Sequence, residues 1–99
     1  MRVFSKSTLR AFWETPGRED SEGPLRAWHA EAEKAQWRSF ADVRKSYATA
    51  SAVGSDRVVF NIGGNKYRLI VRINYPFAGV LVRFIGTHEE YGQVDASKV

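Results

Sequence analysis

One stretch constrains the fold of this chain more than any other: DRVVFNIGGNKYRLIVRI, residues 56–73. Apolar side chains recur at every second position before the letters GGN, at Val58, Phe60 and Ile62. Successive side chains of a β-strand point to opposite faces, so this period of two predicts a strand. The glycines then supply a tight turn. We therefore expect a β-hairpin with strands over 57–62 and 66–74.

The two faces of this hairpin differ in character. A loop at Gly64 and Asn65 pairs Phe60 with Leu69, Val58 with Val71 and Asn61 with Arg68, and a loop at Gly63 and Gly64 preserves the parity. The odd-numbered residues of the second strand are apolar: Tyr67, Leu69, Val71 and Ile73. Its even-numbered residues include three cations: Lys66, Arg68 and Arg72. We expect the apolar face to be packed and the cationic face to be concave or open.

The first half of the chain has helical periodicity instead. A short strand at 1–4 is followed by a helix that Ser5 or Ser7 can cap and that the residues ETPGRED end. This helix carries Leu9, Phe12 and Trp13 on one side. A second helix is expected over 21–37, where the spacings of 3 and 4 form an apolar seam of Leu25, Trp28, Ala32 and Ala35.

Two pairs of residues have the spacing of a capping box, Ser39 with Asp42 and Thr87 with Glu90. The first predicts a short helix over 39–47, and the second predicts a helical turn after a last strand at 80–87. The fold class is therefore α+β, with N-terminal helices packed on one face of an antiparallel sheet of at least three strands. Residues 1–99 form a single domain, whose core is expected to contain all three tryptophans.

The charge of the chain is concentrated in one segment. Of the 15 basic residues, five lie between Arg57 and Thr87, which contains no Asp or Glu. The other residues hold the remaining 10 basic and all 11 acidic groups, so the net charge of +4 is carried entirely by this segment. Concentrated positive charge indicates a polyanionic partner, nucleic acid before membrane, or a solvated face that is simply basic.

Composition removes several classes of protein. The chain has no cysteine, which excludes disulfide scaffolds and thiolate zinc sites and fits a cytoplasmic protein. No apolar run approaches the ~20 residues of a membrane span, and no secretory signal is recognisable. The only histidines, His29 and His88, are too far apart to build a metal site, so we expect no metal and no cofactor. His29 is expected to be a surface or partly packed helix residue.

The residues RVVFNIGGNKYRLIVRINY and VRFIGTHEEY resemble the HigB family of bacterial toxins, within the RelE-type group. The resemblance extends from about Trp28 to Tyr91, and three motifs mark it: W-x-x-F-A-D-V at 37–43, F-N-x-x-G-N-K-Y-R-L at 60–69 and T-H-x-x-Y at 87–91. It implies a small α+β toxin that cleaves messenger RNA, for most relatives on the ribosome. It also implies inhibition by a HigA-type helix-turn-helix antitoxin, through which alone operator DNA would be contacted. Gly92 departs from the family, since many relatives have an acidic residue there.

A ribonuclease that uses side chains alone must deprotonate a 2′-hydroxyl, stabilise charge at phosphorus and protonate the leaving 5′-oxygen. The resemblance and the charge pattern imply five catalytic residues: Arg68, His88, Tyr91, Lys66 and Arg83. Arg68 can hold a phosphate bidentately, and Arg83 joins it only if its strand lies beside the hairpin. Four residues are expected to bind RNA: Asn61, Asn65, Arg72 and Arg57. The last two would face each other, which requires an RNA backbone or an acidic partner between them.

Two alternatives stay open at this point. The same cationic face could serve a non-catalytic module that binds RNA or the ribosome. It could also belong to a ParE-like toxin that inhibits a topoisomerase by protein contact and needs no His88 or Tyr91 beside the cations. Cleavage of transcripts would distinguish a messenger RNA nuclease from both of these alternatives.

Overall fold

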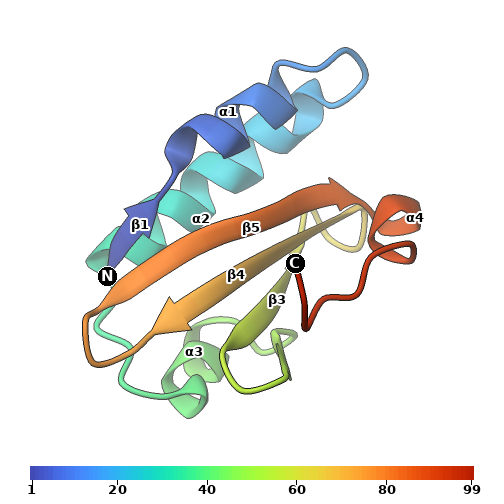
Figure 1. Cartoon of the computed structure of the whole chain (residues 1–99). Helices are drawn as coiled ribbons and strands as arrows, with labels where there is room; N and C mark the ends of the chain where they lie inside the picture. The colour runs from blue at the N-terminus through green and yellow to red at the C-terminus, as the bar shows by residue number, and fades with distance from the viewer.

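A computed structural model describes residues 1–99 as helices packed on a five-stranded sheet, which confirms the α+β class (Figure 1). The strand order is β1-β5-β4-β3-β2. No helix has both the length and the apolar character that a membrane crossing requires. In chain order, the elements are β1 (Arg2–Phe4), α1 (Lys6–Trp13), the 3₁₀ turn η1 (Glu19–Ser21), α2 (Glu22–Lys34), α3 (Phe40–Ser46), β2 (Ser51–Val53), β3 (Arg57–Ile62), β4 (Tyr67–Asn74), β5 (Gly79–Thr87) and α4 (His88–Tyr91).

The predicted hairpin is present, with its register as expected from a loop centred on Gly64 and Asn65. Strands β3 and β4 are antiparallel, and the partners include Phe60 with Leu69, Val58 with Val71 and Asn61 with Arg68. Pairing stops one step earlier than predicted, at Ile62 and Tyr67, so four residues form the turn and Lys66 is a turn residue. Gly63 and Gly64 adopt φ of +63° and +71°, a region that other residues rarely adopt.

The helices cover the apolar face of this hairpin, as predicted. Trp13, Trp28 and Trp37 are all buried, which confirms their place in the core. Phe60 lies at the centre of an aromatic cluster, with its ring centroid 5.5 Å from that of Trp28 and 5.1 Å from that of Tyr47. The helices contribute further buried side chains to the same core, namely Leu9, Leu25, Ala32 and Val43. His29 is partly packed on α2, also as expected, with Nδ1 3.5 Å from a Glu33 oxygen.

The sheet is mixed, because strand β1 runs parallel to its neighbour, a direction that the local sequence pattern does not predict. Strands β3 to β5 pair antiparallel, as expected, and β2, which was not predicted, adds a further antiparallel strand beside β3. Strand β1 joins the outer edge of β5 in parallel, with Arg2 opposite Gly79 and Phe4 opposite Leu81. A parallel neighbour is possible because α1, α2 and the rest of the chain separate the two strands in sequence.

The prediction that the cationic face is open was wrong for its centre. Val59 on β3 and Ile70 on β4 point to this face, yet both are buried. The chain after α4 folds back across them, and Ala96 packs against both residues. Apolar residues around these three complete a small second core: Val53, Phe84, Tyr91, Val94 and Val99. The C-terminal segment therefore covers the centre of the cationic face and separates its two ends.

The two expected capping boxes have different outcomes. At the start of α4, the Thr87 hydroxyl accepts from the Glu90 N–H at 3.1 Å, and the Glu90 carboxylate accepts from the Thr87 N–H at 2.8 Å. This box is complete. At α3 the helix forms, but the Asp42 carboxylate accepts from the Arg38 N–H at 2.9 Å, and Ser39 makes no side-chain cap. Ser5 occupies the N-cap of α1 without a side-chain bond to the helix backbone, and its hydroxyl lies 3.2 Å from the hydroxyls of Ser7 and Thr8 instead.

Candidate functional site

One end of the cationic face is built on the hairpin turn. Asn61 and Arg68 are partners across β3 and β4. The Asn61 amide donates to the Asn65 side-chain oxygen at 3.3 Å. The Arg68 guanidinium donates from Nη1 to the backbone carbonyls of Asn65 at 2.9 Å and Tyr67 at 3.2 Å. Carbonyl groups therefore orient Arg68, and its charge has no acidic partner.

Lys66 lies two residues before Arg68, but its ammonium forms an ion pair with an acid from the N-terminal part of the chain. The Lys66 ammonium forms an ion pair with the Asp20 carboxylate, and the Tyr67 hydroxyl donates to the other Asp20 oxygen. The hydrogen bond from Lys66 lowers the pKa of Asp20, and the same bond raises the pKa of Lys66. Burial, followed by the bond to Asp20, raises the pKa of Tyr67. At neutral pH, Asp20 is therefore ionised and Lys66 and Tyr67 are protonated, which are the states that favour this contact.

Helix α4 brings His88 to the same turn. Thr87, at the end of β5, is the register partner of Tyr67. The His88 N–H donates to the Lys66 carbonyl at 3.1 Å, which joins the start of α4 to the hairpin turn. His88 is exposed, and its ring makes no hydrogen bond or ion pair. The backbones of Lys66, Arg68 and His88 thus lie at one end of the sheet, although the Lys66 ammonium turns towards Asp20 and the Tyr67 ring.

Tyr91 lies on the side of α4 that faces the second core. Its side chain is partly buried against Val59, Ile70 and Ala96. The neighbouring Glu90 forms an ion pair with Arg18, at 3.2 Å between Oε1 and Nη2. The backbone hydrogen bond from Thr87 lowers the pKa of Glu90, and Arg18 lowers it further. Among the predicted catalytic residues, Tyr91 is therefore the one whose side chain packs against a hydrophobic cluster.

Arg83 lies on the strand next to the hairpin, as its expected role requires. Strand β5 pairs with β4 but carries a bulge: Ile70 is opposite Phe84, whereas Val71 is opposite Val82. Arg83 is the extra residue, without a partner on β4. Its side chain is exposed and forms no hydrogen bond or ion pair. Arg68 and Arg83 are thus the two cations of β4 and β5 that no acid neutralises.

The other end of the cationic face is neutralised from within the chain. Arg57 and Arg72 are direct partners across the hairpin, as predicted. The Asp56 carboxylate lies between them, accepting from Arg57 Nη1 at 2.7 Å and from Arg72 Nε at 2.8 Å. Arg57 also donates to the Val99 carbonyl at 2.9 Å, and its side chain is only 13% exposed. Arg72 is half exposed, so it is the more accessible of the two.

Sequence reasoning missed the ion pairs of three acids around the site: Asp20 with Lys66, Asp56 with Arg57 and Arg72, and Glu90 with Arg18. Asp56 had a local signal, because it directly precedes the strand that carries Arg57. Glu90 was recognised as a capping residue but not as a partner of Arg18. Asp20 had no signal, since 46 positions separate it from Lys66.

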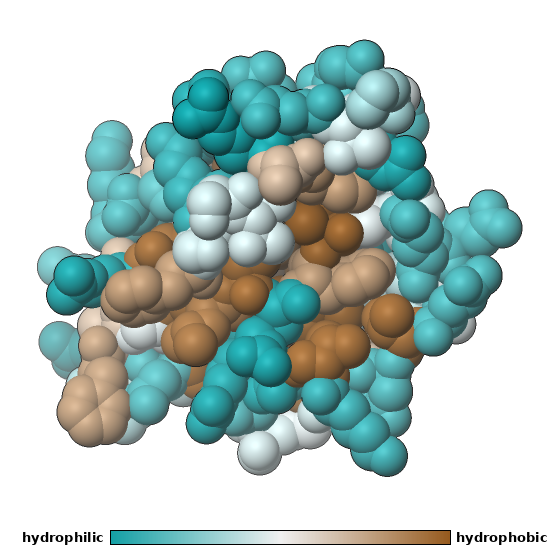
Figure 2. Space-filling model, turned by 45° about the horizontal axis from the view of Figure 1, so that its top comes forward, coloured by the Kyte–Doolittle hydropathy of each residue, from teal (hydrophilic) through white to brown (hydrophobic).

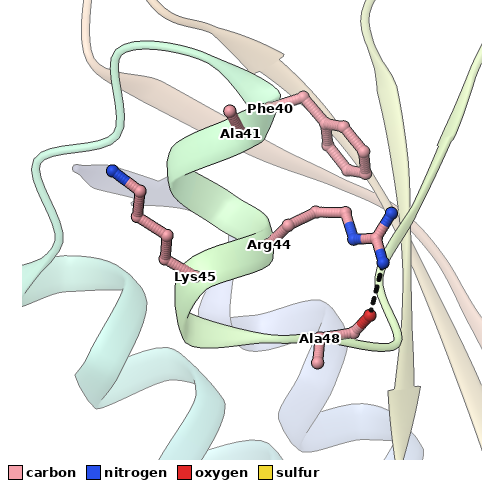
Figure 3. A pocket seen from close by; sticks show the side chains of 5 residues that line it. All are labelled: Phe40, Ala41, Arg44, Lys45 and Ala48. Carbon is pink, nitrogen blue, oxygen red and sulfur yellow. Dashed lines mark hydrogen bonds between the residues drawn. The ribbon is translucent and has the colours of Figure 1, made fainter.

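The surface pockets lie elsewhere. The largest has a volume of about 540 Å³ and is an open hollow on α3, lined by Phe40, Ala41, Arg44, Lys45 and Ala48 (Figure 3). None of the predicted site residues lines this pocket or either of the two smaller ones. No group of three or more His, Asp and Glu side chains is placed to hold a metal ion. The candidate site is therefore a shaped outer surface, which suits a polymer better than a small molecule.

A second surface feature lies along β5, where apolar side chains remain partly uncovered. Figure 2 shows apolar side chains gathered across the middle of one face, bounded by hydrophilic ones. The partly buried or exposed apolar residues of β5 and its neighbour β1 are Val3, Phe4, Leu81, Val82, Phe84 and Ile85. Val82 and Ile85 pack against the main core, whereas Phe84 packs against the second core, on the face that carries the cations. Apolar side chains left partly uncovered on strands are candidates for a protein contact.

Comparison with known proteins agrees with this arrangement. The family model described as HigB_toxin, RelE-like toxic component of a toxin-antitoxin system, matches residues 21–94. The match includes β3, β4, the turn between them, β5 and α4, which together carry all of the predicted site residues. No curated protein sequence matches the chain significantly. Because the family match covers most of the chain and the fold agrees with it, the protein belongs to the HigB family of RelE-like toxins of toxin-antitoxin systems.

Proposed function

We propose that this toxin is an endoribonuclease that cleaves messenger RNA on the ribosome and thereby stops translation. The observation that carries the proposal is the set of three groups at the hairpin turn: Arg68, oriented by two carbonyls and unpaired with any acid, Lys66 and the exposed His88. RNA cleavage by attack of a 2′-hydroxyl needs cations at phosphorus and groups that move protons. These three groups supply both kinds.

Each residue of the site has a proposed role in this chemistry. Arg68 holds the scissile phosphate and stabilises the charge that grows as the 2′-oxygen attacks phosphorus. Lys66 and Arg83 add positive charge on either side. His88 and Tyr91 transfer protons, one from the 2′-hydroxyl and one to the departing 5′-oxygen. The side chains alone are sufficient for this reaction, so the proposal includes no metal.

The remaining predicted residues serve as docking groups. Asn61 and Asn65 form a polar rim beside Arg68, where an amide can hydrogen-bond to a base or a sugar. Arg72 can exchange its exposed contact with Asp56 for a contact with an RNA phosphate. Arg57 is largely enclosed, so we assign it to supporting Arg72 through their shared carboxylate.

An antitoxin partner follows from the family, and we propose that it is a helix-turn-helix protein of the HigA type. We propose that it covers the free cations of β4 and β5 with acidic groups, since charge complementarity guides such contacts. The apolar residues along β5, Phe84 among them, adjoin these cations and offer an anchor. Operator DNA would be contacted only through the antitoxin. Since its targets are messenger RNA and ribosomes, the toxin would act in the cytoplasm.

The proposal is tested by mapping RNA 5′ ends after induction, with and without a block of translation initiation. We expect new ends within translated messages, and we expect them to disappear when initiation is blocked. Ends that persist under the block would show cleavage independent of ribosomes. Growth arrest with intact transcripts and trapped topoisomerase would contradict the nuclease and favour the ParE-like alternative. Arrest with neither would leave a non-catalytic binding module.

A further inference from the structure

The short segment before α2 reaches both halves of the proposed active site. Asp20 binds the hairpin turn through Lys66 and Tyr67. Arg18, two residues earlier, binds α4 through the Glu90 carboxylate at 3.2 Å. Asp20 thus pairs with a cation of the turn, and Arg18 pairs with an acid of α4. None of these contacts is apparent from the motifs of the sequence.

This segment is itself held in place, unlike the partners of most surface ion pairs. Ser21 is fully buried, and its hydroxyl donates to the Arg18 carbonyl at 2.7 Å. The Arg18 guanidinium lies 5.5 Å from the centre of the Phe12 ring, which packs edge-on against Tyr67 with centroids 5.4 Å apart. Asp20 therefore projects from a backbone that is already ordered. An ion pair formed from such a position loses less conformational entropy than one between two free side chains.

Lys66, the other partner of this ion pair, needs a fixed contact because its own side chain is flexible. Lys66 follows two glycines in the turn, and the lysine side chain is a flexible stem that ends in a single point charge. Arg68 is oriented by backbone carbonyls, but the Lys66 ammonium has only one carboxylate contact, that with Asp20. The only other contact of this ammonium is with the face of the Tyr67 ring, 5.5 Å from its centroid, so Asp20 is its one charged partner.

We propose that Asp20 is a positioning residue, which fixes the Lys66 ammonium at the hairpin turn, next to the Tyr67 ring, for contact with the scissile phosphate. The inference rests on the proposed nuclease function and names a residue outside the hairpin and α4 for that reaction. It has a physical cost, because a carboxylate this close to the site weakens the attraction of RNA before reaction. The charge of Asp20 should therefore oppose binding while it assists the chemical step.

These opposite effects define the test, which uses the variant Asp20→Asn. Asparagine keeps the size of the side chain and an oxygen that can accept from Tyr67, but it loses the charge. We expect the single-turnover rate for bound RNA to fall by up to ~10²-fold, as for a catalytic group misplaced by about 1 Å. We expect RNA affinity at low salt to stay equal or rise. The slope of log affinity against log salt should become steeper by up to ~0.7, the value for one phosphate contact on a single strand, because Asp20 no longer partly neutralises the charge of Lys66.

Glu33→Gln is the matched control. It makes the same change of charge at an exposed residue of α2, beside His29 and near the N-terminus of the chain. We expect its cleavage rate and its salt slope to equal those of the wild type. If Asp20→Asn has the wild-type rate and the wild-type slope, Asp20 does not position Lys66. If Asp20→Asn and Glu33→Gln change alike, the effect is one of net charge, and the inference also fails.

A second measurement separates this inference from the proposed function. NMR titration of the Lys66 ammonium reports its pKa and its mobility without any cleavage. In Asp20→Asn we expect the pKa of Lys66 to fall towards its ordinary value and its signal to become that of a mobile side chain. If the wild-type toxin never cleaves RNA, the nuclease proposal fails, and these NMR changes still decide whether Asp20 fixes Lys66. If Lys66 is equally mobile in both proteins, Asp20 has no positioning role.

Discussion

The backbone N–H of His88 donates to the backbone carbonyl of Lys66 at 3.1 Å, so the start of α4 is joined to the hairpin turn through main-chain atoms alone. Side-chain substitutions at either residue leave this bond intact. The capping box of Thr87 and Glu90 stabilises the same end of α4. Variants of the site should therefore change chemistry or binding while the fold remains.

Arg68→Ala should slow the cleavage of bound RNA by ~10²-fold, or roughly 2.7 kcal/mol, because the lost contact is strongest in the transition state. Arg68→Lys keeps the charge but loses the planar fork, and we expect it to retain most of the defect. Single-turnover cleavage with saturating toxin measures this step. Circular dichroism should show unchanged folding. A wild-type rate for both folded variants would mean that the scissile phosphate lies elsewhere.

His88→Gln and Tyr91→Phe should each lower the rate of cleavage by removing a group that can move a proton, typically a 10²- to 10⁴-fold contribution. The phenylalanine keeps the ring that packs against Val59 and Ile70, so stability should be preserved. The pH dependence of the single-turnover rate should lose one limb in each variant. Two active variants with unaltered pH profiles would remove both residues from the mechanism.

Arg72→Ala tests docking apart from chemistry. We expect weaker RNA binding and a smaller salt dependence, by ~0.7 in the log–log slope, with little change in the rate for bound RNA. The reason is distance, since Arg72 is four residues from Arg68 along β4, about 13 Å at ~3.3 Å per residue. Fluorescence anisotropy over a range of salt concentrations measures both quantities. A large loss of the chemical rate would move Arg72 into the catalytic group.

Gly86→Ala should destabilise the fold, whereas Gly79→Ala on the same strand should not. A Cβ at Gly86 would lie 2.6 Å from the Phe84 ring and 3.2 Å from the Glu90 Cβ, but a Cβ at Gly79 meets no heavy atom within 4 Å. Neither glycine has a positive φ, so the comparison isolates the steric term. We expect a loss of about 1–3 kcal/mol for Gly86→Ala in urea denaturation. Equal stability of the two variants would show that the Phe84 ring moves at no cost.

Acid should unfold the protein partly through Asp20, Glu90 and Asp95. Hydrogen bonds from Lys66, Thr87 and Ser97, respectively, lower the pKa values of these carboxyl groups below their ordinary values of 3.8, 4.5 and 3.8. A lowered pKa means that the fold favours the ionised form. The resulting stability is therefore present above these ordinary values and is lost as the pH falls through the folded ones. Tm measured against pH should be flat near neutrality and should fall below about pH 4.5. This decline should be smaller in Asp20→Asn, and an identical decline would exclude Asp20 as a contributor.

Much of the site's scaffold could be predicted because its determinants are local. Alternation along 58–73 and the glycines of the turn place Arg68 opposite Asn61, and the structure has this pair. The spacing of Thr87 and Glu90 likewise predicted the start of α4 correctly. The covered centre of the cationic face was missed, although Val59 and Ile70 are apolar residues on that face. Two apolar side chains on a face assumed to be solvated indicate that another segment packs there.

Local patterns in the sequence are enough to predict the hairpin, its register, the separation of its two faces and the membership of the family. These depend on side-chain period, turn residues and motifs that lie within a few positions of one another. Which cations are free depends instead on contacts between segments that lie far apart in the chain. Asp20 reaches Lys66 across 46 positions because η1 and α1 pack against the hairpin, and the C-terminal segment reaches Ile70 because α4 reverses the chain. An ion pair of this kind depends on distance in space, which no local pattern of residues encodes.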